Sequence, residues 1–106
     1  MSATIPPGTV TTVQERVGTR VEPPAMYRVL LHNDDFTTKA FVVQVLVAVF
    51  HKGLAEATEL MWQVHRKGVG VAGVFPREVA ETKIATVVAL AREAEFPLRV
   101  SMEPEP

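Results

Sequence analysis

Residues 27–38 read YRVLLHNDDFTT and contain two contrasting halves. The first half is rich in residues that favour extended backbone, and it predicts a strand over 27–32. The second half clusters Asn, Asp and Thr, which are typical of a turn because their side chains bond to the nearby backbone. Thr37 or Thr38 can cap a following helix, because its hydroxyl accepts a hydrogen bond from a free N–H of the first helical turn.

The segment after this turn predicts a helix over residues 38–51. Its apolar residues recur at helical spacing, and further valines widen the stripe until the helix is apolar nearly all round. Such a helix is either buried in the centre of the fold or lines a site. The residues at helical spacing are Phe41, Val45, Leu46, Val49 and Phe50.

Two more helices and two more strands follow. LAEATELMWQVHRK (54–67) has an apolar face at helical spacing and predicts the second helix. KGVGVAGVF (67–75) predicts a glycine-interrupted strand, Pro76 suits the start of a third helix over 77–93, and LRVSM (98–102) predicts the last strand. The order is β-α-α-β-α-β, which makes an α+β fold with three strands covered by three helices.

The first 26 residues differ from the rest of the chain. They are rich in Thr, Pro and Gly, carry two Pro-Pro pairs and show no helical stripe. We therefore predict a flexible N-terminal extension over 1–26 and one folded domain over 27–106. The extension lacks the basic and apolar stretches of a secretory signal, and no apolar run approaches a membrane span, so we expect a cytoplasmic protein.

The composition excludes several kinds of protein. The chain has 106 residues and no cysteine, and its 11 basic and 12 acidic residues give a net charge of -1. The absence of cysteine rules out disulfide scaffolds, thiolate zinc sites and cysteine nucleophiles. The charge balance argues against a nucleic-acid binder, which usually carries a basic surplus or stripe.

Enzymatic chemistry finds little support in the sequence. The only serines are Ser2 and Ser101, near the two ends of the chain, so a serine nucleophile with a histidine partner is not expected. Phosphate-binding and dinucleotide-binding loops are missing, and the His and Asp residues lack a metal-binding spacing. Asp34 and His65 remain as an acid and a base for a small enzyme. We expect no catalysis, no cofactor and no metal site.

A ligand site is a more specific hypothesis. Met61, Val64 and His65 share one face of the second helix. If the turn at 33–35 meets that face, an apolar pocket gains oxygen acceptors and an imidazole at its rim, which suits an apolar side chain beside a cationic amine. The simpler interpretation is an Asx turn with a helix cap, and a histidine that stabilises the end of its helix. The pattern alone leaves both interpretations open.

Three segments of the chain resemble the ClpS family of adaptors for Clp-type proteases. They are PPAMYRVLLHNDDFTT (23–38), ELMWQVHRKG (59–68) and GVFPREVAETKIATVVALAREAEFPL (73–98), in the family's order and spacing. The resemblance covers residues 27–102 and implies a ClpS-like domain with an antiparallel sheet. It also implies an adaptor that binds proteins by a bulky hydrophobic first residue (Phe, Tyr, Trp or Leu) and delivers them to a ClpA-type unfoldase with the ClpP protease.

The partners implied by this resemblance are the N-terminal domain of the unfoldase and the N-degron, which is the first residues of the substrate. We expect a monomer that binds neither nucleic acid nor membrane. Glu78 and Lys83, on the exposed side of the third helix, would dock on the unfoldase. The unfoldase would also engage the N-terminal extension.

The resemblance also assigns roles at the ligand site. Asn33 and His65 would hydrogen-bond the α-amino group of the substrate, Asp34 would hold the amine and the first peptide unit, and Asp35 would shape the turn. The pocket for the first side chain would be lined or bordered by Thr37, Lys39, Val42, Met61, Val64 and Leu98.

Lys39 departs from the family's pattern, in which a methionine commonly gates the pocket against β-branched residues. Its aliphatic stem can cover the pocket while its ammonium reaches water, but the cation opposes binding of a cationic amine. His32, just before the turn, can gain a charge at mild acidity. If Lys39 disables the pocket, the fold would serve a different interaction through its third helix.

Overall fold

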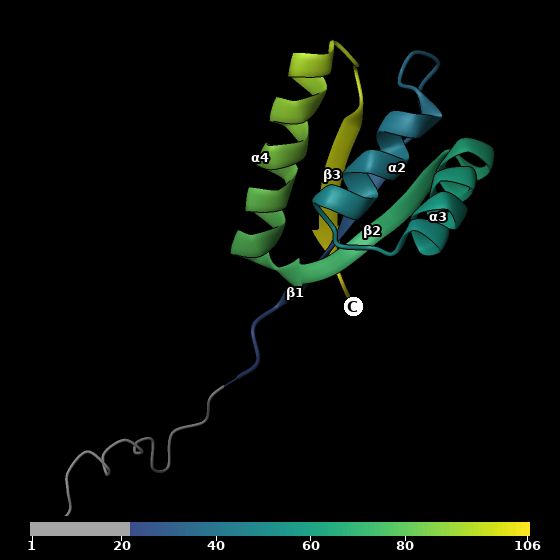
Figure 1. Cartoon of the computed structure of the whole chain (residues 1–106). Helices are drawn as coiled ribbons and strands as arrows, with labels where there is room; N and C mark the ends of the chain where they lie inside the picture. The colour runs from purple at the N-terminus through teal and green to yellow at the C-terminus, as the bar shows by residue number, and fades with distance from the viewer. Residues whose placement is uncertain (1–21) are drawn as a thin grey trace, which may run out of the picture.

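A computed structural model describes residues 22–106, and its elements follow the predicted order (Figure 1). The fold class is therefore confirmed, and the second helix begins and ends at the predicted residues. The elements are β1 (Met26–His32), α2 (Lys39–Ala48), α3 (Leu54–Lys67), β2 (Val69–Pro76), α4 (Arg77–Ala94) and β3 (Arg99–Pro104).

The three strands form one antiparallel sheet in the order β2-β1-β3. The central strand is β1, which pairs along its length with both neighbours, so its backbone groups are satisfied on both edges. Val29 and Leu31 lie two residues apart on β1 and are both buried, as expected when alternate side chains of a strand point to the same face.

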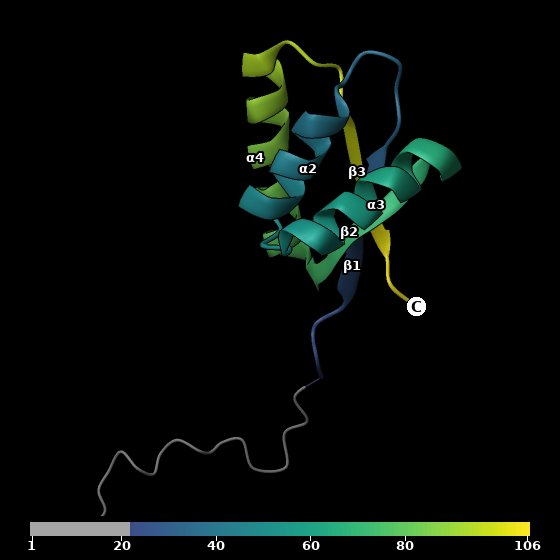
Figure 2. The same ribbon diagram turned by 45° about the vertical axis from the view of Figure 1, so that its right-hand side comes forward.

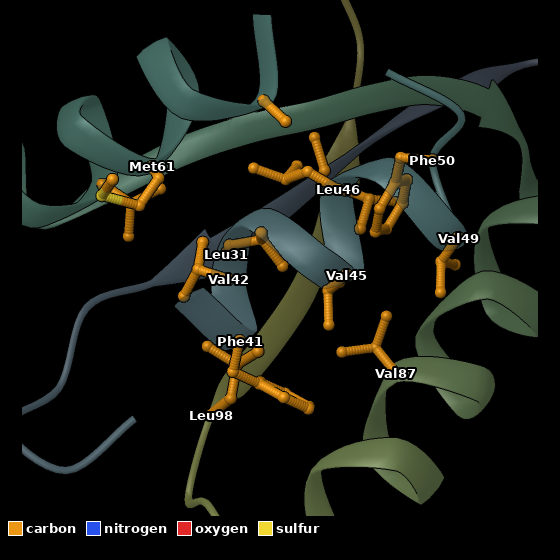
Figure 3. Close-up of a cluster of buried hydrophobic side chains, with 14 of the residues drawn as sticks. Leu31, Phe41, Val42, Val45, Leu46, Val49, Phe50, Met61, Val87 and Leu98 are labelled. Atoms are coloured by element: carbon orange, nitrogen blue, oxygen red, sulfur yellow. The ribbon is translucent and has the colours of Figure 1, made fainter. Parts of the chain in front are cut away.

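The three helices cover one face of this sheet, with α2 between α3 and α4 in both orientations (Figures 1 and 2). Residues from α2 and α4 meet over the sheet in one hydrophobic core, shown in Figure 3. The fully buried side chains include Val45 and Leu46 of α2 and Val87 of α4. Burial of each such side chain contributes about 1.5–3 kcal/mol. The central, largely apolar α2 thus buries one face in the core, with Phe41, Val42, Val45 and Leu46, while its other face is exposed.

The predicted helix over 38–51 extends too far at its C-terminal end, because α2 ends at Ala48. Val49 and Phe50 are buried all the same, so their apolar character reflects packing rather than helical structure. His51 adopts a positive φ of 58°, and the backbone N–H of Lys52 donates to the carbonyl of Leu46. Hydrophobic periodicity cannot locate such an end, since burial continues through the turn.

Most of the predicted extension, residues 1–21, lies outside the described part of the chain. The described remainder has no regular structure until Met26, where β1 begins one residue before the predicted domain boundary. The division into extension and domain stays a prediction. No helix within residues 22–106 has the length and apolar character needed to cross a membrane.

The helix cap of α2 gives a test of the local fold. Thr38 is its N-cap, and the Thr38 hydroxyl accepts a hydrogen bond of 3.1 Å from the backbone N–H of Phe41. Thr38→Ala should lower the free energy of unfolding by about 1 kcal/mol, measured by urea denaturation. Thr86→Ala is the control, because that exposed hydroxyl only bonds back to the Thr82 carbonyl within α4. Equal losses in the two variants would contradict the capping role.

Candidate functional site

The turn between β1 and α2 is organised by the carboxylate of Asp34. Its Oδ1 accepts hydrogen bonds from the backbone N–H of Phe36 (2.8 Å) and of Thr37 (2.7 Å). Its Oδ2 accepts a third bond, of 2.7 Å, from the Thr37 hydroxyl. The structure therefore gives the turn-shaping role to Asp34, whereas the sequence interpretation gave it to Asp35. The Asx turn and the helix cap that formed the simpler interpretation are both present.

A backbone hydrogen bond ties this turn to the end of α3. The N–H of Asn33 donates to the carbonyl of Gly68 over 2.9 Å. Gly68 is the C-cap of α3 and has a φ of 88°, a left-handed conformation that favours glycine. The reversal at Gly68 brings the 33–35 turn beside the last turns of α3, as the ligand-site hypothesis requires.

The turn, the start of α2 and the second half of α3 enclose a cavity of about 310 Å³. Eight of the nine residues assigned to amine and side-chain binding line it, and they come from all three segments. The sequence interpretation did not place Asp35, Phe36 and Thr38 on this lining. The full lining is Asn33, Asp34, Asp35, Phe36, Thr37, Thr38, Lys39, Val42, Met61, Val64 and His65.

The ninth residue, Leu98, does not line this cavity. It is buried beside Phe41 in the core (Figure 3). Leu98 directly precedes β3, and its apolar side chain packs in the core beside Phe41 of α2. A motif match fixes its position along the chain but not the direction of its side chain.

The apolar part of the cavity is formed by Val42, Met61 and Val64, all of which are buried. In Figure 3 Met61 extends from α3 towards Val42 on α2. Strand β2 supports this part from behind, and Gly70 is the point of closest approach. A Cβ atom at Gly70 would lie 2.8 Å from Cγ2 of Val64, so a larger residue there requires the Val64 side chain to shift.

The exposed part of the lining is polar or aromatic. The ring of His65 is exposed and lies 5.8 Å, centroid to centroid, from the ring of Trp62 in an edge-on arrangement. Phe36 is 75% exposed, an unusual state for a large apolar residue. The hydrogen bonds of Asp34 to the two backbone groups after it hold Phe36 at the tip of the turn. Its place inside an Asx turn is the only sequence signal that predicts this exposure.

Lys39 lies at the first residue of α2 and reaches towards α3. Its Nζ is 5.7 Å from the centroid of the Trp62 ring, within the range of a cation–π interaction. The side chain thus extends from α2 towards α3 at the cavity, and its ammonium remains at the exposed surface. This geometry agrees with the expectation that the stem covers the pocket while the charge stays in water.

Two titratable groups have shifted pKa values. Burial works against the ionisation of Asp34, but the hydrogen bonds from the Thr37 hydroxyl and from two backbone N–H groups outweigh it and lower the pKa of the carboxyl. Burial, with the positive charge of Arg99, lowers the pKa of His32, whose Nε2 lies 2.7 Å from the Ser101 hydroxyl. His32 therefore gains its charge at a lower pH than an ordinary histidine, and it lies outside the cavity lining.

The two residues assigned to unfoldase docking lie on α4, away from the cavity lining. Glu78 is exposed in the first turn of α4. Lys83 is only half-exposed: its Nζ donates a hydrogen bond of 2.8 Å to the carbonyl of Val49 and lies over the rings of Phe50 and Phe75. Lys83 thus joins α4 to the end of α2. The sequence pattern placed this residue on the exposed side of the helix and did not predict the contact.

Potential metal ligands do not cluster in the described part of the chain. Within residues 22–106, no three His, Asp or Glu side chains come together as metal ligands. The cavity instead combines amide, carboxylate and imidazole groups with an apolar floor. That combination can bind a group that is cationic at one end and apolar at the other.

The family model and the related proteins that match this chain all belong to one family. Residues 22–101 match the family described as ATP-dependent Clp protease adaptor protein ClpS. The ATP-dependent Clp protease adapter protein ClpS of Desulfatibacillum aliphaticivorans is 59% identical over 86 residues, which cover 81% of this chain and 83% of that protein. The protein of the same name in Myxococcus xanthus is 57% identical over 86 residues, covering 81% of this chain and 80% of that protein.

A solved structure shares the fold. The structure of Agrobacterium tumefaciens ClpS2 bound to L-phenylalaninamide matches with a TM-score of 0.75 and 42% sequence identity. The match covers 78% of this chain and 100% of that one.

The shifted pKa of Asp34 predicts a pH dependence of stability. A lowered pKa in the folded state means that the stabilisation by this carboxylate is present above its ordinary value of 3.8 and is lost as the pH falls through the folded value. Asp34→Asn should lower the free energy of unfolding by about 1 kcal/mol at pH 7, and the difference from the wild type should shrink towards pH 2.

Asp35→Asn is the matched control for this measurement by urea denaturation. It removes the same charge from an exposed neighbour that accepts no hydrogen bond from another described residue, so its effect should stay near zero at both pH values. If the two variants respond alike to pH, the hydrogen bonds of Asp34 are not the cause.

Proposed function

The chain belongs to the ClpS family of ATP-dependent Clp protease adaptor proteins, and from this premise we propose that it binds proteins by a bulky hydrophobic N-terminal residue. Phe, Tyr, Trp and Leu are the residues of this class. The observation that carries the proposal is the single cavity in which eight of the predicted residues meet. The phenylalaninamide bound to the related ClpS2 supports it, because that ligand has a free amine beside a benzyl side chain.

The substrate's α-amino group is recognised at the polar part of the cavity. An ammonium group has three N–H donors, and Asn33, Asp34 and His65 offer an amide oxygen, a carboxylate and a ring nitrogen. A carboxylate has about four acceptor positions, and the turn occupies three of those of Asp34. The remaining position and the negative charge are available to the amine.

The first side chain of the substrate enters the apolar part of the cavity. The volume of about 310 Å³ lies at the small end of the range of ligand pockets, which suits one side chain rather than a larger molecule. Burial of an aromatic or leucine side chain against Val42, Met61 and Val64 contributes about 1.5–3 kcal/mol. A small or charged first residue gains none of this and is bound weakly.

Delivery to the protease is the second part of the proposal. The adaptor acts without catalysis and as a monomer in the cytoplasm, and it docks on the N-terminal domain of a ClpA-type unfoldase that works with ClpP. The family to which the chain belongs supports a Clp partner. Glu78, exposed on α4 and outside the cavity lining, allows docking and substrate binding at the same time. Lys83 is the second docking residue on α4, and its hydrogen bond to the Val49 carbonyl also holds α4 against the end of α2.

Substrate recognition is tested with a labelled peptide that begins with Phe. We expect N-acetylation of this peptide to weaken binding by at least about tenfold in fluorescence anisotropy, because it removes the charge-assisted hydrogen bonds. His65→Ala should weaken binding in the same direction, whereas Gln63→Ala, on the same helix but outside the cavity lining, should not. Equal affinity for free and acetylated peptides would refute the proposed function.

Docking is tested separately from peptide binding. Glu78→Ala should weaken binding to the N-terminal domain of a ClpA-type unfoldase by about fivefold or more, measured by calorimetry, and leave the affinity for the Phe peptide unchanged. Glu93→Ala removes the same charge from the exposed surface near the other end of α4 and serves as the control. If Glu78→Ala binds the unfoldase domain like the wild type, docking uses another surface.

A further inference from the structure

Helix α3 borders two surface features, the cavity described above and a groove. Met61, Val64 and His65 line the cavity described above. The residues next to them in sequence, Trp62 and Arg66 among them, line a neighbouring groove of about 500 Å³. The groove is lined by Glu56, Glu59, Leu60, Trp62, Gln63, Arg66 and Lys67.

Lys39, Trp62 and Arg66 form the boundary between the cavity and the groove, and we refer to these three residues as the basic ridge. Lys39 lines the cavity, Trp62 and Arg66 line the groove, and both cations contact the same indole ring. The Nζ of Lys39 lies 5.7 Å, and the Cζ of Arg66 lies 5.1 Å, from the ring centroid. Two positive charges are thus held on one aromatic side chain at the mouth of the cavity.

The two cations of the basic ridge form no ion pair shorter than 4.0 Å with another residue of the described part of the chain. Within residues 22–106, the ion pairs shorter than 4.0 Å join other residues: Arg28 to Glu103 and Glu105, Lys52 to Glu56, and Arg77 to Glu81. Lys39 and Arg66 are both exposed. Both cations are therefore available to a ligand, although carboxylates line the same cavity (Asp34, Asp35) and the same groove (Glu56, Glu59).

A peptide that leaves the cavity past Trp62 comes close to this ridge. If the α-amino group is held at His65, the ring of Trp62 is 5.8 Å from the ring of that histidine, while successive Cα atoms of a peptide are 3.8 Å apart. The second and third residues of the substrate therefore come within reach of Lys39 and Arg66. Lys39 also stands near the incoming ammonium, and like charges at that range repel each other.

We propose that the basic ridge makes Lys39 and Arg66 specificity-determining residues for substrates with an acidic residue at position two or three. This inference rests on the proposed function and narrows its substrate class. A carboxylate placed at the ridge pairs with both cations and screens the substrate's ammonium from Lys39. A neutral residue leaves that repulsion in place, and a lysine adds to it.

The preference is measured with three peptides that differ only at positions two and three, beginning Phe-Glu-Glu, Phe-Gln-Gln and Phe-Lys-Lys. We expect the wild-type protein to bind the Glu peptide about two- to fivefold more tightly than the Gln peptide, the range typical of exposed ion pairs. The Lys peptide should bind more weakly than either. The Glu/Gln ratio should fall as salt is added, because screening weakens exposed pairs.

Variants locate the origin of the preference. Lys39→Met keeps an unbranched stem at the cavity and removes the charge, so it should lower the Glu/Gln ratio, and Arg66→Gln should lower it as well, because each variant leaves one cation of the ridge in place. Lys67→Gln removes the same charge from the residue adjacent to Arg66, outside the ridge, and should preserve the ratio. Thermal unfolding of each variant confirms that the fold is kept.

The outcomes separate this inference from the function on which it rests. A wild-type ratio of one, or an equal loss of preference in Lys67→Gln and Lys39→Met, overturns the role of the ridge while peptide binding itself stands. Failure of all three peptides to bind through a free amine overturns the proposed function and the ridge with it.

Discussion

The carboxylate of Asp34 is the constraint on which the site depends. Its three hydrogen bonds fix residues 34–37. The fixed turn places Thr38 as the cap of α2, which in turn sets where Lys39 and Val42 enter the cavity. The same negative charge that organises the turn is the one that the proposed ligand amine requires. Folding of the turn and recognition of the ligand therefore share one group, and a change in its ionisation acts on both.

Two further hydrogen bonds hold the turn against α3 and α2 against α4. The Asn33 N–H bonds to Gly68 at the end of α3, and the Lys83 ammonium bonds to Val49 at the end of α2. Each bond joins segments far apart in the sequence, and in each the acceptor is the backbone carbonyl of the residue that caps the C-terminal end of a helix. The first bond holds the turn beside α3 at the cavity, and the second holds α2 against α4 away from it, which favours a site formed before the ligand arrives.

The sequence predicted the fold well, because turn-forming clusters and apolar periodicity mark five of the six elements within about two residues. It failed at the end of α2, where Val49 and Phe50 stay buried after the helix has ended. The site was predicted by motif, and eight of nine lining residues meet. Leu98 turns into the core, and Asp34 rather than Asp35 accepts the hydrogen bonds of the turn, because side-chain direction depends on backbone angles that composition does not reveal. Lys83 was assigned to the surface because its bond to Val49 requires knowledge of how α2 and α4 pack.

Gly70 shows how control of the cavity extends beyond its lining. It lies on β2, behind α3, and has no surface in the cavity, yet a methyl group there would collide with Val64. The position of the Val64 side chain, which lines the cavity, thus depends on a residue outside the lining. A library of variants restricted to lining residues would never sample it. For anyone who wishes to enlarge or reshape the pocket by directed evolution, the strand behind the helix is as much a part of the design space as the helix itself.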